Sequence, residues 1–168
     1  SLAFLVLINF NFFTIILALG SMPLAFTYPL MKRFTYWPQL FLGVTFNYGL
    51  ILGWTAIKGN LEIVPILFYL GAIFWTLGYD TIYGAQDMSD DEIIGLKSTS
   101  IKFKNNIKLF VGTSYFFTTI ILILLLINTI NINLANLFIL LFILSLVLQI
   151  FKFDKDKPIT CLNVFKSN

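Results

Sequence analysis

Long apolar runs constrain the fold of this chain more than any other feature. A helix needs about 20 apolar residues to cross the hydrocarbon core of a bilayer. Five runs approach or reach that length, at residues 12–28, 38–57, 62–79, 107–128 and 133–152. Only 11% of the residues are charged, whereas soluble domains carry about 25%. Backbone polar groups in lipid must be satisfied within the protein, so we expect an all-α, polytopic transmembrane bundle with five full spans. Residues 2–8 are apolar but too short to cross, and they predict a helix stub.

The positions of the cations predict which connections share a membrane face. Connections 29–37 and 80–106, together with Lys108 and the tail from residue 152, carry ten of the eleven Lys and Arg residues. Connections 58–61 and 129–132 carry only Lys58. Cations gather on the cytoplasmic side of membrane proteins or its equivalent. We therefore expect the connections rich in cations to lie together on that side.

The residue types exclude several classes of catalysis within this chain. There is no histidine, and Cys161 is the single cysteine. A Ser-His-Asp or Cys-His mechanism is therefore excluded, and so is an internal disulfide. A zinc, haem or iron–sulfur centre would lack its usual ligands.

Residues 80–91 hold four of the eight carboxylates of the chain, directly after a predicted span. Carboxylates gathered at a membrane surface repel one another, which predicts a counter-ion. Mg²⁺ takes oxygen ligands and shares its shell with phosphate, so it is the expected cation. A solvated acidic loop that caps a helix would give the same pattern, and it is the more frequent role of carboxylates in general.

Two local structures are possible for the acidic segment. Asp80, Asp87 and Asp91 are spaced i, i+7 and i+11, so a helix that continued from the span would carry them on one face. Alternatively Gly84 breaks the helix, and Ser89 with Glu92 forms a capping box that starts a short helix at Ser89. Both structures keep Asp87 near Asp91.

A second polar cluster lies at the end of the first span. Pro29 disfavours the α conformation at Tyr28, so the helix either ends there or restarts with Pro29 in its first turn. Lys32 and Arg33 follow at the membrane surface. They are either ordinary cations flanking a span or, with Tyr28, donors to a diphosphate opposite the carboxylates.

Some polar and aromatic residues lie deeper in the predicted spans. Phe46, Phe74 and Trp75 could line a cavity in which ring faces stabilise a carbocation. Asn47 sits in the middle of a span, where we favour a polar contact between helices over a contact with substrate.

Taken together, these blocks resemble the UbiA superfamily of intramembrane prenyltransferases, and among them the 4-hydroxybenzoate polyprenyltransferases of ubiquinone biosynthesis. The resemblance extends over nearly the whole chain and rests on the order and spacing of Tyr28–Arg33, Pro38-Gln39, Leu42-Gly43, Tyr79–Tyr83, Asp87–Asp91 and Gly95–Thr99. It implies Mg²⁺-dependent transfer of a polyprenyl group from polyprenyl diphosphate to the ring of 4-hydroxybenzoate. It also implies a bundle of nine transmembrane helices in the bacterial inner or mitochondrial inner membrane, with the active site on the cytoplasmic or matrix side.

The resemblance assigns roles to individual residues. Asp87 and Asp91, with Asp80 just upstream, correspond to the second aspartate-rich motif that binds Mg²⁺. Tyr28 and Lys32 correspond to a Tyr-x-x-x-Lys motif that contacts the diphosphate, and we expect them to be catalytic. We expect Arg33 and Lys97 to contact substrate, and Asn47 is kept as a candidate for substrate contact beside its favoured role between helices.

The family pattern is incomplete in this sequence. The first aspartate-rich motif is absent, the last helix is not apparent in the polar tail, and Lys104 stands where the family commonly has glycine. We therefore expect residues 1–168 to form one transmembrane prenyltransferase domain, incomplete at both ends, that alone does not complete the metal site. Haem O synthase and chlorophyll synthase use the same donor chemistry and are alternatives. A transporter fragment is the alternative from another class, although its binding site would be expected near the bilayer midplane.

Overall fold

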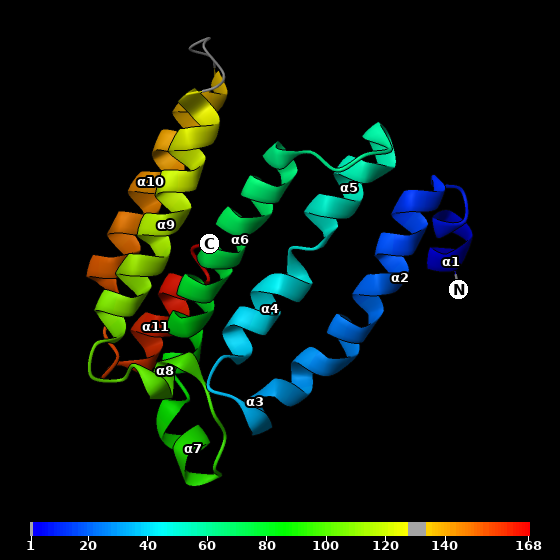
Figure 1. The fold of residues 1–168 in the computed structure, drawn as a ribbon. Coiled ribbons are helices and arrows are strands. Elements are labelled where there is room, and N and C mark those ends of the chain that lie inside the picture. Colours follow the sequence, from blue (N-terminus) through cyan, green and yellow to red (C-terminus); the bar gives the residue numbers. More distant parts are fainter. Residues whose placement is uncertain (1, 128–133) are drawn as a thin grey trace.

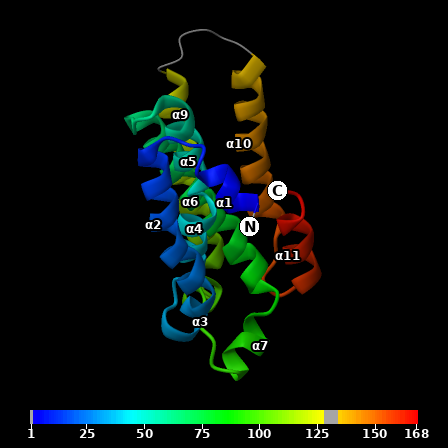
Figure 2. The same ribbon diagram turned by 90° about the vertical axis from the view of Figure 1, so that its right-hand side faces the viewer.

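The computed structural model describes residues 2–127 and 134–168, and within these residues all regular structure is helical. Figures 1 and 2 show long helices side by side in a bundle, with most of the short helices grouped toward one end. The helices are α1 (Leu2–Leu7), α2 (Phe12–Thr27), the 3₁₀ helix η1 (Tyr28–Leu30), α3 (Met31–Phe34), α4 (Pro38–Phe46), α5 (Gly49–Lys58), α6 (Ile63–Ala85), α7 (Met88–Ile93), α8 (Thr99–Lys102), α9 (Ile107–Ile127), α10 (Leu134–Lys152) and α11 (Pro158–Phe165).

Four helical segments of the described residues are long and apolar enough to cross a membrane. They are Phe12–Phe34, Pro38–Lys58, Ile63–Ala85 and Ile107–Ile127. The fifth predicted span, 133–152, corresponds to α10, which is helical from Leu134 to Lys152 and contains the shorter apolar segment Asn136–Lys152. Residue 133 lies outside the described residues. The all-α membrane architecture and the stub α1 are thus confirmed, with four segments of full length where five were expected.

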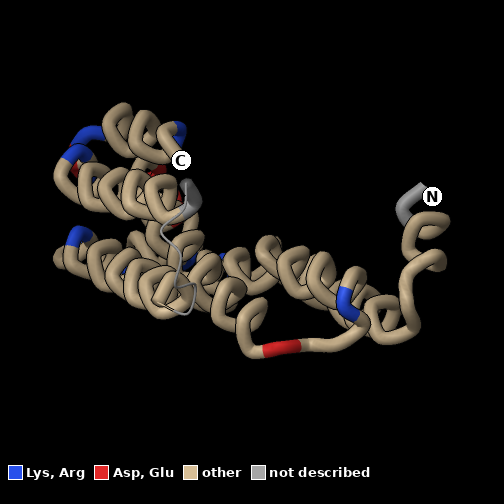
Figure 3. The backbone as a smooth tube through the Cα atoms, turned by 90° about the horizontal axis from the view of Figure 1, so that it is seen from above, with Lys and Arg blue, Asp and Glu red and all other residues tan. Residues whose placement is uncertain are grey.

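The connections that the structure describes alternate between the two ends of the bundle, as the cations predict, whereas the predicted connection 129–132 lies outside the described residues. In Figure 1, α3, α7, α8 and α11 gather toward one end, and the α5–α6 connection lies at the other. The first end holds the segments rich in cations, and we call it the basic end. Figure 3 shows that charged residues occupy few places along the tube. Many large apolar side chains are exposed, among them Phe12, Phe26 and Phe116.

The first span begins where a polar side chain interrupts the apolar sequence. Asn11 caps α2 because its Oδ1 accepts a hydrogen bond from Thr14 N at 2.9 Å. Asn11 Nδ2 and Thr14 Oγ1 also donate to Thr55 on α5, at 2.8 and 3.1 Å. These bonds link α2 to α5 within the bundle.

The second span is broken at its centre. Asn47 ends α4, and its Nδ2 donates to Gly43 O and to Thr76 Oγ1 on α6, both at 2.8 Å. A further contact of this amide reaches Ala72 O at 3.3 Å. The expected polar contact between helices is confirmed, and it satisfies carbonyls at the break between α4 and α5.

The buried core lies near the basic end, between α6, α9, α10 and α11. Its members are Ile82, Ala85, Ile107, Val111, Tyr115, Leu146, Phe153, Cys161 and Val164. At Gly78 the backbone of α6 lies so close to the ring of Tyr115 on α9 that a Cβ would overlap the ring. Tyr115 is buried and donates a 2.6 Å hydrogen bond to Gln149 Oε1 on α10. Small residues at such crossings are what allow helices to approach closely in membranes.

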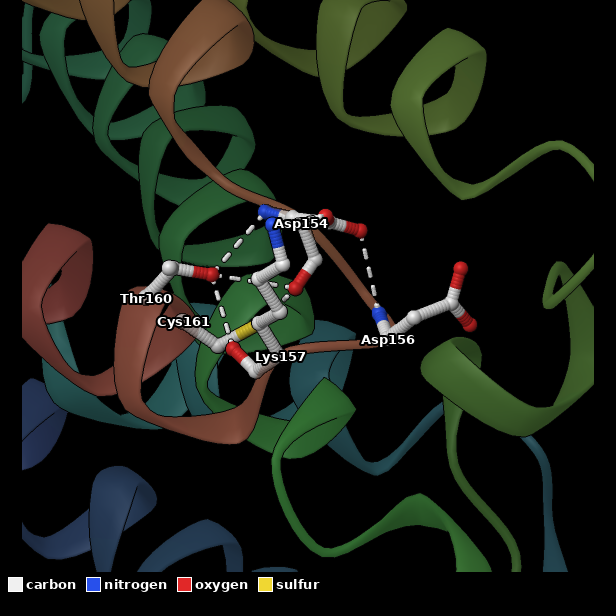
Figure 4. A network of polar contacts seen from close by, with 5 residues as sticks. All are labelled: Asp154, Asp156, Lys157, Thr160 and Cys161. Atoms are coloured by element: carbon white, nitrogen blue, oxygen red, sulfur yellow. Dashed lines mark hydrogen bonds and ion pairs between the residues drawn. The ribbon is translucent and has the colours of Figure 1, made fainter.

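The tail contains a helix that the sequence did not predict. Pro158 begins α11, which packs against α6 and buries Cys161 and Val164. Figure 4 shows the turn before it, where Thr160 Oγ1 accepts from Asp154 N at 3.1 Å and Cys161 Sγ donates to Asp154 O at 3.2 Å. Burial raises the pKa of the Cys161 thiol. The tail is therefore folded back onto the bundle and is not a polar extension.

Further local predictions, on the acidic segment and on Tyr28, need correction. α6 continues to Ala85, so the connection at the basic end starts later than residue 80, and α7 begins at Met88. The continuous helix through Asp91 is wrong, and so is the capping box, because Asp87 occupies the N-cap and Ser89 lies inside α7. Tyr28 keeps an αR conformation although Pro29 follows it, and the predicted restart is confirmed, because η1 begins at Tyr28 with Pro29 in its first turn.

Candidate active site

A pocket of about 440 Å³ opens at the basic end, and most of the predicted site residues line it. η1 and α3 contribute Tyr28, Pro29 and Lys32, and α4 contributes Pro38, Gln39 and Leu42. The remaining lining comes from α6, α7 and the segment after α7: Asp80, Tyr83, Gly84, Asp87, Asp91, Lys97 and Ser98. The pocket thus joins two cationic segments to one acidic segment that are far apart in the sequence.

A tight turn at the end of α7 directs the chain from the carboxylates back to Lys97. Gly95 adopts φ +75°, and its N–H donates to Glu92 O at 3.2 Å. The N–H of Leu96 donates to Asp91 O at 2.8 Å. This is a Schellman arrangement, which glycine adopts without the steric cost of a Cβ.

Main-chain hydrogen bonding ties the acidic connection to the first cationic segment. The backbone N–H of Lys97 donates to Lys32 O at 2.8 Å. The ammonium of Lys97 lies 3.3 Å from Phe34 O and 5.6 Å from the centre of the Tyr36 ring. Lys32 and Lys97 are therefore held at one edge of the pocket by bonds that do not depend on a ligand.

A buried polar network supports the floor of the pocket. Thr81 Oγ1 on α6 lies 2.6 Å from Thr99 Oγ1 on α8, and Ser100 Oγ donates to Thr81 O at 2.7 Å. Gln39 Oε1 on α4 accepts from Thr99 N at 3.0 Å. Thr81, Thr99 and Ser100 have no exposed surface. Buried hydrogen bonds of this kind fix the position of the short helix α8 against the membrane helices.

Neighbouring charges act on the pKa of Asp91 at the pocket. The pKa of Asp91 is raised, mainly because the side chain is partly desolvated. Lys32 opposes the shift, and Asp87 and Asp90 reinforce it. Opposite charge at Lys32 and like charge at Asp87 and Asp90 therefore both act on Asp91.

The carboxylates of the pocket suit a metal ion that takes only part of its ligands from the protein. Among residues 2–127 and 134–168, no three acidic or sulfur side chains lie close enough to hold a metal by themselves. Mg²⁺ typically binds one or two carboxylates and completes its shell with water and substrate phosphates. Asp87 and Asp91, which line one pocket beside two lysines, fit that mode of binding.

Two predicted contact residues lie outside the pocket lining. Arg33 is exposed on α3, and the amide of Asn47 is bonded to α4 and α6. Conversely, Gln39, Tyr83 and Ser98 line the pocket although no role was predicted for them. Gln39 belongs to one of the blocks that carry the family resemblance, and its polarity at the start of an otherwise apolar helix was the available signal for a role.

Comparison with known proteins identifies the family. The sequence model of the UbiA prenyltransferase family matches residues 1–168. The human mitochondrial 4-hydroxybenzoate polyprenyltransferase is 53% identical over 109 residues, which are 64% of this chain and 29% of the human protein. The Arabidopsis thaliana protein of the same name is 50% identical over 107 residues, which are 62% of this chain and 26% of that protein. The aligned part is thus less than a third of these relatives.

The fold has a solved counterpart. The apo structure of a UbiA homologue from Aeropyrum pernix K1 superposes with a TM-score of 0.73 at 18% identity. The match covers 96% of this chain and 66% of the archaeal chain. The sequence match over the full chain and the shared helical membrane fold agree: this integral membrane chain belongs to the UbiA prenyltransferase family.

Proposed function

We propose that the protein transfers a polyprenyl group from polyprenyl diphosphate to the ring of 4-hydroxybenzoate, as a step of ubiquinone synthesis. The observation that carries the proposal is the pocket in which Asp87 and Asp91 lie with Lys32 and Lys97. The similarity of about 50% to proteins named 4-hydroxybenzoate polyprenyltransferase supports this acceptor. The active site would then lie on the cytoplasmic or matrix side of a bacterial or mitochondrial inner membrane.

The reaction separates charge at the pocket and requires it to be neutralised. The allylic C–O bond of the donor breaks, and the electron pair leaves with the diphosphate. The ring carbon ortho to the phenol then forms a C–C bond with the allylic cation, and the ring proton departs to a base. Lys32 and Lys97 stabilise the departing diphosphate by charge, and Tyr28 offers a phenolic O–H to its oxygens.

Mg²⁺ held by Asp87 and Asp91, with Asp80 nearby, would supply further positive charge to the diphosphate when bound. The reaction requires that water be kept from the cation, since water would capture it as a prenyl alcohol. Pro29, Pro38 and Leu42 form an apolar part of the pocket lining.

The proposal is tested with the full-length protein in detergent or nanodiscs, Mg²⁺ and a polyprenyl diphosphate. Mass spectrometry of the products should show prenylated 4-hydroxybenzoate. Haem and a chlorophyllide, offered as competing acceptors, should remain unmodified. Transfer to one of those acceptors in preference would overturn the assignment of the substrate, and absence of transfer to every acceptor would overturn the activity.

A further inference from the structure

Gln39 presents an amide whose two ends have different surroundings. The side chain is 6% exposed and lies in the first turn of α4, on the wall of the pocket. Its Oε1 accepts from the backbone N–H of Thr99, 60 positions away in the sequence. Because that partner is a donor, the oxygen must face Thr99 and the amino group must face away.

The amino group of Gln39 is left without a partner among the described residues. Neither of its N–H groups donates to a protein acceptor, and Nε2 is not enclosed by protein atoms. Within the described residues these two donors face only the pocket, so they are satisfied either by water or by a ligand that accepts from them there.

The backbone of α6 makes room for this amide. A Cβ on Gly84 would lie 3.2 Å from Gln39 Nε2 and 2.8 Å from Ser100 Oγ. Gly84 itself lines the pocket, between Asp80 and Asp87 in the sequence. The absence of a side chain at Gly84 therefore keeps the space beside the amino group open.

We infer that Gln39 binds an oxyanion of the substrates through Nε2 while its Oε1 holds Thr99 in place. The inference rests on the proposed function, because that function brings oxyanions to this pocket. Two oxyanions are available, the diphosphate of the donor and the carboxylate of the aromatic acceptor. Both accept hydrogen bonds from an amide N–H, and the lysines at the same pocket favour either one.

The variant Gln39→Glu distinguishes the role of the side-chain oxygen from that of the amino group. The carboxylate can still accept from Thr99 N, but it replaces the donors with a negative oxygen among the carboxylates of the pocket. Gln149→Glu is the matched control, because Gln149 is also buried, on α10, and its amide bonds Tyr115 and Asn168 away from the pocket. Both variants bury an added carboxylate, but only one changes the pocket.

Binding is measured on the full-length protein in detergent by calorimetric titration, with inorganic pyrophosphate plus Mg²⁺ in one arm and 4-hydroxybenzoate in the other. We expect Gln39→Glu to lower the affinity for one of the two ligands by about tenfold or more. Gln149→Glu should bind both ligands as the wild type does. The arm that responds identifies which oxyanion Gln39 contacts.

Gln39→Met provides a second variant if the carboxylate prevents folding. It removes both ends of the amide and should weaken the same ligand by about fivefold or more. Unchanged affinity for both ligands in a folded Gln39 variant would overturn the inference while leaving the proposed function intact. A wild-type protein that binds neither ligand would overturn both. A loss in Gln39→Met with wild-type affinity in Gln39→Glu would show that Gln39 only holds Thr99, which also overturns oxyanion binding.

Discussion

The helices α2 and α6 are both apolar and long enough to help cross a bilayer, but they are held in different ways. In the segment Phe12–Phe34, which contains α2, 6% of the residues of its most apolar window are buried, against 33% in Ile63–Ala85, which is α6. α6 contacts α4, α5, α8, α9 and α11, whereas α2 contacts mainly α4, α5 and η1. The carboxylates and the buried polar network belong to the α6 side.

The comparison shows that contacts within the protein position α6 more than they position α2. Lipid is as apolar as a leucine side chain, so apolar area alone does not hold membrane helices together. α6 is fixed by close approaches at small residues and by polar bonds such as Thr118 Oγ1 to Gly71 O at 3.2 Å. α2 has fewer such contacts, and its outer face is free to meet lipid or other protein segments.

We expect the largest effect on catalysis from substitutions of the carboxylates that line the pocket. Asp91→Ala or Asp87→Ala in the full-length protein should lower kcat by about a hundredfold or more, because the leaving diphosphate loses charge neutralisation. Asp90→Ala is the matched control, since Asp90 is exposed on the same short helix and does not line the pocket. Near wild-type turnover of both pocket variants in excess Mg²⁺ would contradict the site.

The next effect concerns the cation contributed by the α2 side. Lys32→Ala should reduce kcat/KM for the polyprenyl diphosphate by about tenfold to a hundredfold, and Lys32→Arg should recover part of it, because charge is kept while geometry changes. Kinetics with varied donor and saturating 4-hydroxybenzoate measure this. Lys102→Ala serves as control, because Lys102 lies over the Trp37 ring at 4.5 Å and outside the pocket. An unchanged rate and donor KM in Lys32→Ala would exclude the diphosphate role.

A smaller effect tests the close packing of α6. Gly78→Ala should lower the free energy of unfolding by about 1–3 kcal/mol, because the new Cβ meets the buried ring of Tyr115. Denaturant unfolding of the protein in detergent measures the change. A stability equal to that of the wild type would mean that α9 shifts freely, and the contrast between α6 and α2 would lose its basis.

The smallest effect belongs to α2. Nothing lies within 4 Å of a Cβ built on Gly20, so Gly20→Ala should change the free energy of unfolding by less than about 1 kcal/mol. The same denaturant series measures it beside Gly78→Ala. A loss as large as that of Gly78→Ala would show that α2 packs against protein along this face.

Much of the fold was predictable because its signals are local. Run length predicted the membrane helices, including the start of the first span at residue 12, and the alternation of cations predicted which of the described connections meet. The break before α7 was harder to predict, because both the spacing of Asp80, Asp87 and Asp91 and the Ser89 capping box were plausible locally. The tail helix α11 was missed because it is too short to show periodicity and is stabilised by packing on α6.

The site shows the same division. Tyr28, Lys32, Lys97 and the carboxylates could be predicted from residue type and order, and the structure brings them to one pocket. The contribution of Gln39 depends on its hydrogen bond to Thr99, far away in the sequence, and on the open space beside Gly84. Such long-range pairings leave no pattern in a single sequence.

The buried thiol of Cys161 gives this chain an intrinsic chemical reporter. It is the single cysteine of the 168 residues, it has no exposed surface, and it lies on the helix that closes the core near the basic end. Alkylation needs an accessible thiolate, and burial both hides the sulfur and raises its pKa. The rate at which a maleimide reacts with Cys161 therefore measures how often α11 detaches from the bundle, without any engineered label.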